Sequence, residues 1–350
     1  MKTRTLIFRL STSVILLLLC SMSAYANSTK KDERKFTQNE TDQAINAAPN
    51  LPFVPGSFTL AVLPDTQKYH KRNAKHFFSQ TKWIAKNASK YNIAYVIFLG
   101  DITNNNTPAE WKNAKKAIDA LGKGGIPYSL AYGNHDYYMR KADGSGFSAN
   151  KKNGSLGNKY FKPEDFKKWP TFGQAMEKGK MDNNYHLFEA NGTRFIILSV
   201  EWAPSDKALS WADEMLNRYP DRKAIFITHA YLYHDNTRYD RNKKDKQSWR
   251  PPQNDGEMIW QKLLKKHKNV ILVLCGHVLG DGLGQLTSTG ENGNKVHQIL
   301  VNYQMNKEGG SGFLRLIEFL PDGKTLQLKS YSPSLNEYKT DSQNQFTLKL

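Results

Sequence analysis

Short apolar segments alternate with longer amphipathic segments from residue 58 onward. The apolar segments have the length of buried strands, and the segments between them place apolar residues at helical spacing. Strand–helix–strand units of this kind predict a parallel sheet with helices on its faces. The predicted strands are residues 58–63, 93–99, 126–131, 223–228 and 269–275, and the predicted helices are residues 72–91, 107–121, 206–218 and 256–267.

Two short motifs predict where elements begin or turn. Thr107 and Glu110 have the spacing of a capping box, and Pro108 stands at the first helical position after it. The dipeptide Asn191-Gly192 separates two apolar segments and predicts a tight hairpin turn between strands.

The pattern changes near the C-terminus, where apolar segments are separated by turn residues. We expect these segments to form an antiparallel meander of strands. No internal repeat is evident, and the whole pattern predicts one domain with two packed sheets. The segments of the meander are residues 295–304, 312–320, 325–332 and 345–350.

The N-terminus has the features of a secretory signal peptide. A basic start precedes an apolar stretch that is too short for a membrane span, and Ala24-Tyr25-Ala26 provides a small-residue cleavage site. We therefore expect a secreted protein, periplasmic or extracellular, with no membrane span in its mature form; a short uncleaved anchor is the alternative. The expected divisions are a signal peptide at residues 1–26, a flexible segment at residues 27–52 and a folded domain at residues 53–350.

The chain is strongly basic, with a formal net charge of +18. Removal of Lys2, Arg4 and Arg9 with the signal peptide would leave +15. A field of this sign attracts phosphates, nucleic acids or acidic envelope surfaces. Loss of Cys20 would leave Cys275 as the only thiol, which excludes an intramolecular disulfide and predicts that Cys275 packs as a small apolar residue.

Polar side chains follow each predicted strand of the parallel pattern. In open α/β sheets, ligand groups collect just beyond the carboxyl ends of the strands. Carboxylate, amide oxygen and imidazole without thiolate suit borderline divalent ions, and pairs of such ions are a recurrent device for hydrolysing phosphate esters. The side chains at these strand ends are Asp65, Gln67, Asp101, Asn134, His135, Asp136, His229 and His277.

The motif series Asp65, GD (100–101), GNHD (133–136), His229 and GH (276–277) resembles the calcineurin-like metallophosphoesterase superfamily. The resemblance implies an α/β fold of four α/β/β/α layers, in which helices flank two mixed β-sheets. It also implies a dinuclear metal centre at the strand ends, with a catalytic histidine beside it.

The resemblance assigns a role to each matching residue. Asp101 would bridge the two metal ions. Asn134, His229 and His277 would complete the shell of one ion, and Asp65 would bind the other. By the same resemblance, His135 would contact the phosphate or protonate the leaving group, and Asp136 would orient His135.

Two positions depart from the usual motifs of the superfamily. Gln67 stands where the first motif commonly has histidine, and Leu279 replaces the second histidine of the last motif. Both missing ligands would serve the ion bound by Asp65. We therefore expect one or two divalent ions, with Mn, Fe or Zn favoured, in one well-formed site and one weaker, oxygen-rich site. Gln67 and Asp281 are candidate ligands there, although Asp281 between two glycines is also typical of a turn carboxylate.

Two segments that follow the motif residues combine cations with aromatic side chains, which can hold a phosphate and stack a base or sugar. A polar strand face near residue 302 either lines the cleft or forms hydrogen bonds in the core. The aromatic and cationic residues of the first segment (137–184) are Tyr137, Tyr138, Arg140, Lys141, Lys151, Lys152 and Lys159. Those of the second segment (231–254) are Tyr231, Tyr233, Arg238, Lys243, Lys244 and Trp249. The residues of the polar strand face are His297, Asn302 and Gln304.

The combined features predict a secreted metal-dependent phosphoesterase that hydrolyses a phosphate ester with metal-activated water. A phosphorylated small molecule is the expected substrate. One alternative is a nuclease or phosphodiesterase acting on nucleic acid, which the positive charge favours. The other is a metal-stabilised binding protein that kept the fold and lost turnover through the changes at Gln67 and Leu279.

Overall fold

The computed structural model describes residues 50–141, 144–243 and 253–350, which belong to one compact unit. The predicted signal peptide lies outside the described residues, as do residues 27–49 of the predicted flexible segment. Lys244 and Trp249 of the second aromatic and cationic segment also lie outside them. Among the described residues, no helix combines the length and apolar character needed to cross a membrane.

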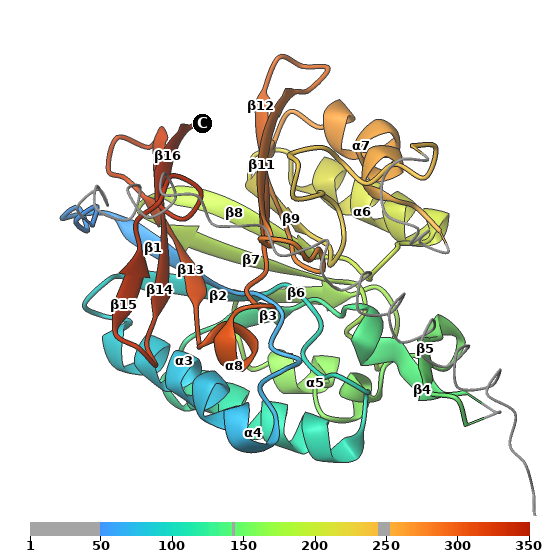
Figure 1. Ribbon diagram of the computed structural model, residues 1–350. Helices are drawn as coiled ribbons and strands as arrows, with labels where there is room; N and C mark the ends of the chain where they lie inside the picture. Colours follow the sequence, from blue (N-terminus) through green and yellow to red (C-terminus); the bar gives the residue numbers. More distant parts are fainter. Residues whose placement is uncertain (1–49, 142–143, 244–252) are drawn as a thin grey trace, which may run out of the picture. The chain divides into compact units, whose positions relative to one another are not determined.

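The first sheet contains the predicted N-terminal strands and most of the C-terminal ones. Three parallel strands run side by side at its centre and edge, and the C-terminal strands pair antiparallel beside them. Figure 1 shows the result, with the blue β1 next to the red β13 although their sequences are far apart. The strand order is β15 (Glu337–Lys339), β14 (Thr325–Ser332), β13 (Leu314–Phe319), β1 (Phe58–Leu63), β2 (Ile93–Phe98) and β3 (Tyr128–Leu130), with β16 (Phe346–Lys349) also paired to β14.

The second sheet is also mixed. Its central strands β8, β9, β10 and β12 run parallel, and antiparallel strands complete both edges. The order is β11 (Leu283–Thr289), β12 (Lys295–Val301), β10 (Val270–Cys275), β9 (Lys223–Ile227), β8 (Thr193–Ser199), β7 (Asn184–Ala190) and β6 (Phe172–Ala175); β4 (Tyr138–Arg140) and β5 (Phe147–Ala149) form a separate small sheet.

The predicted C-terminal meander is wrong in one respect. Residues 295–301 form β12, which joins the second sheet parallel to β10, whereas β13, β14 and β16 return to the first sheet. The chain therefore crosses from the second sheet to the first between β12 and β13, and β11, which the sequence pattern did not predict, covers the outer edge of β12. Apolar alternation identifies a strand but not its partner.

Four longer helices cover the outer faces of the two sheets (Figure 1). On β1, Leu60 and Val62 pack between the sheets, whereas Ala61 and Leu63 pack toward the helices. Both faces of the strand are therefore buried, as expected for a parallel sheet with helices outside it. The fold is the predicted mixed α/β architecture. The helices are α3 (Ala74–Asn87) and α4 (Pro108–Lys123) on the first sheet, and α6 (Asp206–Arg218) and α7 (Gly256–Lys262) on the second.

Short helical turns fill the connections. The predicted helix 72–91 is a 3-10 turn followed by α3, and the predicted helix 256–267 is α7 followed by another 3-10 turn. The Thr107–Glu110 capping box at the start of α4 is confirmed. The short turns are η2 (Lys71–Asn73), η3 (Asn134–Tyr137), η4 (Lys151–Asn153), η5 (Leu156–Lys159), α5 (Pro163–Phe166), η6 (Leu264–Lys266) and α8 (Lys307–Gly310).

Candidate metal centre

Three side chains from three strand ends converge on one point. Asp101 follows β2, His229 follows β9 and His277 follows β10. Asp101 Oδ2 lies 3.2 Å from His229 Nε2, and His229 Nε2 lies 3.2 Å from His277 Nδ1. One ligand atom from each residue lies within 4.8 Å of the others. Two nitrogens that are each about 2.1 Å from one ion, at an angle near tetrahedral, lie about 3.4 Å apart, so this spacing suits a shared divalent cation.

A backbone carbonyl fixes the orientation of His229. Its Nδ1 donates to the Leu99 carbonyl oxygen over 2.9 Å. This bond directs the lone pair of Nε2 toward Asp101 and His277, since the proton of a neutral ring then resides on Nδ1. Histidine ligands of metals are commonly oriented through the other ring nitrogen in this way.

Two buried oxygens provide an independent test of whether the site suits a metal ion. Asn134 Oδ1 and Gln67 Oε1 are both buried without a hydrogen-bond partner, and both residues line the same pocket as Asp101 and His277. A buried acceptor that lacks a donor costs free energy, and a cation satisfies it as well as a donor would. The residues present therefore fit a divalent cation.

The backbone of two candidate ligands adopts an unfavourable conformation. Asp101 has φ 46° and His277 has φ 71°, in the left-handed region that non-glycine residues rarely occupy. Strain of this kind persists where surrounding contacts hold the chain, and it is concentrated at functional sites. Close backbone approach is equally restrictive, since a Cβ on Gly133 would lie 2.2 Å from Asp101 Oδ1, and one on Gly276 would lie 2.1 Å from Asp65 Oδ1.

Burial and mutual charge set the protonation of this cluster. Burial by itself raises the pKa of Asp101, but the neighbouring His229 outweighs it and lowers that pKa to about 2. Burial by itself lowers the pKa of His229, but Asp101 and Asp65 outweigh it and raise that pKa to about 9. Burial and the charge on His229 hold the pKa of His277 at about 3. A divalent cation would supply the positive charge that these carboxylates favour and would displace the ring proton.

Asp65 lies against the same cluster but not within the triad of Asp101, His229 and His277. Its two carboxylate oxygens accept the backbone N–H of His277 over 3.2 and 3.1 Å. Burial raises the pKa of Asp65 to about 8, although His229 acts in the opposite direction. Asp65 is therefore buried beside the site, with part of its acceptor capacity already used by the backbone.

Gln67 and Leu279 stand where the motif resemblance would place histidines. Gln67 Nε2 donates to Gln304 Oε1, so the Gln67 side-chain oxygen, which has no hydrogen-bond partner, points away from Gln304. Leu279 is 42% exposed at the rim of the pocket. Asp281 is not a substitute ligand in this structure, because it is exposed and its Oδ1 accepts the Leu283 N–H over 3.0 Å in a surface turn.

His135 lies beside the triad with one ring nitrogen committed. Its Nδ1 bonds the Asn104 carbonyl over 2.7 Å, so Nε2 is the nitrogen available for other chemistry. The ring packs against Tyr138, with centroids 4.0 Å apart and planes tilted by 31°, and both residues line the pocket. The His135 backbone N–H donates to Asp101 Oδ1 over 2.9 Å, which ties the histidine to the metal-binding carboxylate.

Asp136 has a different role from the predicted one. It does not orient the His135 ring, which is held by Asn104. Instead, its fully buried carboxylate accepts the backbone N–H groups of Ile102, Thr103 and Gly133 over 3.1, 2.8 and 3.0 Å. It also accepts the Thr103 hydroxyl over 2.9 Å. Asp136 thus joins the loop that carries Asp101 to the loop that carries Asn134 and His135.

The pocket over the triad has a volume of about 480 Å³. Most of the aromatic and cationic residues predicted to line it lie elsewhere. Tyr138 lines it, whereas Tyr231 and Arg238 bond Gln298 in the second sheet. The polar strand face near residue 302 serves both predicted roles. His297 forms core hydrogen bonds and Asn302 bonds the Val278 carbonyl, whereas Gln304 reaches the pocket. Lys68 and Met305 also line the pocket, but no sequence signal identified them.

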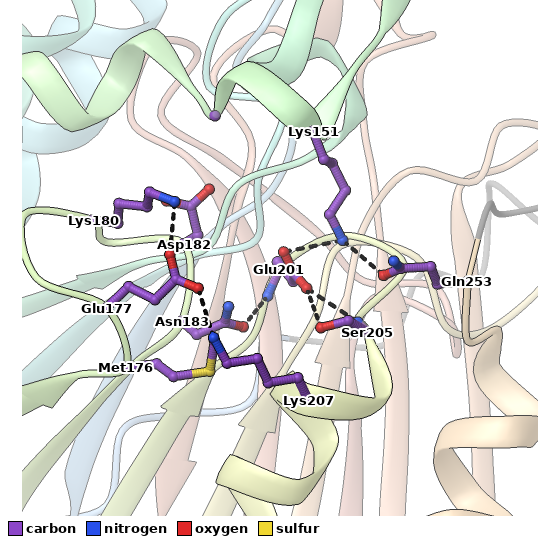
Figure 2. Close-up of a pocket in the computed structure, with 11 residues that line it drawn as sticks. Lys151, Met176, Glu177, Lys180, Asp182, Asn183, Glu201, Ser205, Lys207 and Gln253 are labelled. Carbon is purple, nitrogen blue, oxygen red and sulfur yellow. Dashed lines mark hydrogen bonds and ion pairs between the residues drawn. The ribbon is translucent and has the colours of Figure 1, made fainter.

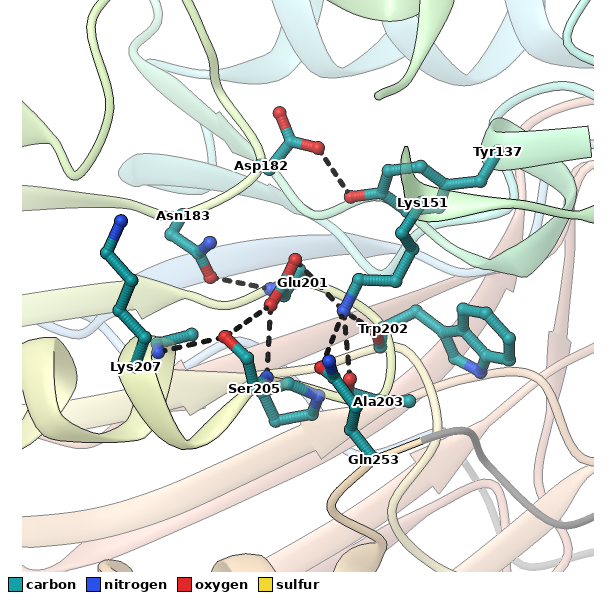
Figure 3. Close-up of polar contacts among 12 residues, drawn as sticks. Tyr137, Lys151, Asp182, Asn183, Glu201, Trp202, Ala203, Ser205, Lys207 and Gln253 are labelled. Carbon is teal, nitrogen blue, oxygen red and sulfur yellow. Dashed lines mark hydrogen bonds and ion pairs between the residues drawn. The ribbon is translucent and has the colours of Figure 1, made fainter. Parts of the chain in front are cut away.

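A second polar pocket, of about 200 Å³, lies between the start of α6 and the segments that follow β5 and β6 (Figure 2). Its cations are paired with acids. Lys151 lies 3.0 Å from Glu201, and Lys180 lies 2.6 Å from Glu177. Figure 3 shows Lys151 also donating to backbone carbonyl groups, including that of Ala203 over 2.9 Å. The pocket is therefore largely neutralised from within.

One hydrogen bond connects this second pocket to the metal centre. Tyr137 follows Asp136 directly in the sequence, is fully buried, and donates its hydroxyl to Asp182 over 2.8 Å (Figure 3). Asn158 donates to the other Asp182 oxygen over 2.7 Å. Burial raises the pKa of Asp182. The network anchors Tyr137 at the end of the η3 turn, which also carries Asn134 and His135.

Comparison with known proteins is consistent with this geometry. Residues 58–281 match the calcineurin-like phosphoesterase family. The chain is 30% identical over 342 residues to Uncharacterized protein YvnB of Bacillus subtilis, which covers 91% of this chain and 24% of that protein. It is 26% identical over 183 residues to Probable glycerophosphodiester phosphodiesterase GpdQ of Arcobacter nitrofigilis, covering 52% of this chain and 55% of that one. The chain therefore spans about a quarter of the length of the first relative and the match about half of the second.

A solved structure shares the fold. Purple acid phosphatase PPD1 from yellow lupin superimposes with a TM-score of 0.52 at 16% identity, covering 86% of this chain and 55% of that chain. The family match extends over more than half of the chain and contains every candidate ligand from Asp65 to His277. The chain therefore belongs to the calcineurin-like phosphoesterase family, a family of dimetal-dependent phosphoric ester hydrolases.

Proposed function

We propose that this protein is a metal-dependent phosphoric ester hydrolase whose substrate is a phosphorylated small molecule. The observation that carries the proposal is the convergence of Asp101, His229 and His277 within 4.8 Å at the ends of three strands. The unpartnered Asn134 oxygen in the same pocket supports it. When bound, divalent ions activate water and neutralise charge on the phosphoryl oxygens.

The protein's own residues supply binding and proton transfer. His135 presents Nε2 beside the triad, while the Asn104 carbonyl holds Nδ1. A protonated Nε2 can bind a phosphoryl oxygen and give its proton to the oxygen of the leaving group. Tyr138 packs against the ring at a tilt, and both side chains line the pocket. The catalytic residue is accordingly His135, with Asp136 as a positioning residue.

We propose two unequal metal sites. Asp101, Asn134, His229 and His277 would form the stronger one, with two imidazoles favouring Mn, Fe or Zn. Asp65, Gln67 and a shared Asp101 would form a weaker, oxygen-rich one. Calorimetric titration of the metal-free protein should give one tight and one weak binding event. Two equal high-affinity events would contradict the proposal.

A phosphodiester is the favoured substrate class. Its support is the similarity to a protein named as a probable glycerophosphodiester phosphodiesterase. The pocket of about 480 Å³ is also large enough for an organic group on each side of the phosphorus. Nucleic acid would be a special case of the same chemistry and would show a steep fall of activity with salt.

Hydrolysis of p-nitrophenyl phosphate and bis-p-nitrophenyl phosphate by the purified, metal-loaded protein tests the proposal. We expect turnover of at least one substrate, with the diester preferred. Asp101→Asn should abolish both turnover and tight metal binding. His135→Ala should lower kcat by about two orders of magnitude or more while metal content stays unchanged. If the metal-loaded protein hydrolyses neither substrate, a binding protein that has lost turnover is the better description.

We also propose that the protein is exported. The basic start, short apolar stretch and Ala24-Tyr25-Ala26 site of its N-terminus support this. Fractionation of the producing cells should find the protein outside the cytoplasm, with Asn27 as its first residue. A cytoplasmic protein that retains Met1 would contradict the proposal.

A further inference from the structure

The pocket at the metal centre continues into a second hollow. The first has a volume of about 480 Å³ and the second about 580 Å³, and Lys68, Gln304 and Met305 line both. Residues 70–73 and Gly309 form the rest of the second hollow. A molecule held by a phosphoryl group at the metal centre can therefore extend past Met305 into this hollow.

Basic side chains surround the second hollow without acidic partners. Lys68, Lys71 and Arg72 all line it, and within the described part of the chain none of them forms an ion pair. The carboxylate on the neighbouring α8 turn, Glu308, is taken by Lys75, whose Nζ lies 3.0 Å away. Three uncompensated cations around one concave surface produce a potential that attracts anions.

The start of a helix adds to this potential. The η2 turn leads directly into α3, and neither begins with a side-chain cap or with an acidic residue in its first turn. The N-terminal end of a helix carries partial positive charge and is normally balanced by acidic or capping side chains. Here Lys71 and Arg72 stand in that position instead. An anion in the hollow would balance both the side chains and the helix.

A buried side chain offers a donor at the junction of the two hollows. Gln304 is 8% exposed, and its Oε1 accepts from Gln67. No described residue accepts a hydrogen bond from the Gln304 amide nitrogen, which is exposed to solvent at this junction rather than buried without a partner. A ligand oxygen beside Met305 would satisfy it, and the exposed Met305 side chain can pack on the apolar part of the same ligand.

We propose that the second hollow binds another anionic group of the substrate. The substrate would then be a phosphate ester whose organic portion carries a second phosphate or a carboxylate, with a short apolar or hydroxylated spacer between the two anions. This inference rests on the proposed function, because it places the reacting phosphoryl group at the metal centre. It also explains why Lys68, Lys71 and Arg72 are gathered beside the pocket without acidic partners.

Calorimetry of the metal-loaded protein with alkanediol bisphosphates of increasing chain length tests the inference. The reference ligands are the matching alkyl monophosphates, and a parallel series of ω-carboxyalkyl phosphates distinguishes a second phosphate from a carboxylate. We expect one spacer length to bind roughly tenfold more tightly than its monophosphate, since a charge-assisted contact adds to the affinity. Lys71→Ala and Arg72→Ala should each lower the affinity for that bisphosphate by roughly three- to fivefold and leave the affinity for the monophosphate unchanged.

Lys82→Ala is the matched control, because Lys82 is an exposed lysine on α3, the helix that follows η2, and it does not line the hollow. It should change neither affinity. Arg72→Glu should reverse the preference, so that the monophosphate binds more tightly than the bisphosphate of the same chain length. Equal affinity for bisphosphates and monophosphates at every spacer length would overturn the inference, even in a protein that hydrolyses p-nitrophenyl esters. A protein that shows the preference without hydrolysis would instead contradict the proposed function alone.

Discussion

The substitution Asp136→Asn separates positioning from metal binding. Each Asp136 oxygen accepts two hydrogen bonds: Oδ1 from the N–H and hydroxyl of Thr103, and Oδ2 from the N–H groups of Ile102 and Gly133. An asparagine retains only one acceptor oxygen, and its NH2 group would face two donors. In the orientation of the amide that keeps the Thr103 bonds, the buried N–H groups of Ile102 and Gly133 are left without an acceptor. In the opposite orientation, the N–H and hydroxyl of Thr103 lose theirs.

The magnitude follows from this count. A buried donor left without an acceptor costs about 1–3 kcal/mol, so the two N–H groups predict a loss of roughly 4 kcal/mol in the free energy of unfolding. Burial raises the pKa of Asp136 to about 7, and Asp101 contributes in the same direction. A folded-state pKa above the ordinary value means that the wild type loses stability as the pH rises from about 3.8 toward 7. Urea unfolding of both proteins should therefore be compared at one pH well above 7, where the carboxylate is ionised and accepts all four hydrogen bonds.

Activity and metal affinity should fall with stability, because Ile102 and Gly133 adjoin Asp101 and Asn134. Loss of a residue that orients metal ligands typically costs about 10- to 100-fold in affinity or activity. Asp322→Asn is the matched control. Asp322 likewise accepts two backbone N–H groups and a threonine hydroxyl, but it is exposed in the β13–β14 turn, at the end of the first sheet opposite the strand ends that carry the ligands.

Asp136→Asn should lower the specific activity per folded molecule, whereas Asp322→Asn should leave it unchanged. An Asp136→Asn protein with wild-type stability would refute the count of lost acceptors. If both variants lost specific activity per folded molecule, the effect would not come from the loops around the metal centre.

Three further predictions concern backbone approach, acid stability and metal binding. Gly133→Ala should abolish metal binding, because its Cβ would lie 2.2 Å from Asp101 Oδ1. Gly122→Ala in α4, with 3.9 Å to its nearest neighbour, should instead raise stability by about 0.5–1 kcal/mol without affecting activity. Metal titration and urea unfolding measure the effects of both changes. Burial lowers the pKa of His186 from 6.5 to about 3, so its contribution to stability is complete above pH 6.5 and is lost as the pH falls toward 3. His186→Phe should flatten this acid limb, and an unchanged limb in urea titrations would assign it to other groups. Saturation with a divalent ion at about 100 times Kd should stabilise the fold by about 2.7 kcal/mol, visible as a higher Tm that a chelator reverses and that His277→Ala largely removes.

The sequence places the candidate ligands Asp101, His229 and His277 directly after apolar strands. Because β9 and β10 are parallel neighbours, His229 and His277 lie at one edge of the second sheet, and Asp101 joins them from the end of β2 in the first sheet, where the two sheets pack. Their convergence depends on short, fixed chain segments after each strand. This is the part of the site that periodicity and motif order determine.

Other features depend on contacts that sequence spacing does not encode. Asp136 follows His135 directly, and adjacency suggested a side-chain pair. The η3 turn, however, directs the carboxylate to the loop after β2 and the imidazole to Asn104. The placement of Lys68 and Met305 at one pocket likewise depends on how two distant loops pack. The pairing of β12 with β10 has the same origin, because strand partners are chosen by tertiary packing.

The way in which the candidate ligands are held supports the proposal that one metal site can form without the two histidines of the superfamily motifs. Leu99 fixes the ring of His229, Asp65 holds the backbone of His277, and Asp136 holds the loops around Asp101. These contacts are made by the protein alone, so the geometry of the first site does not depend on an ion in the second. In the proposed two-site arrangement, Gln67 and Leu279 in place of histidines would therefore weaken one ion without releasing the ligands of the other.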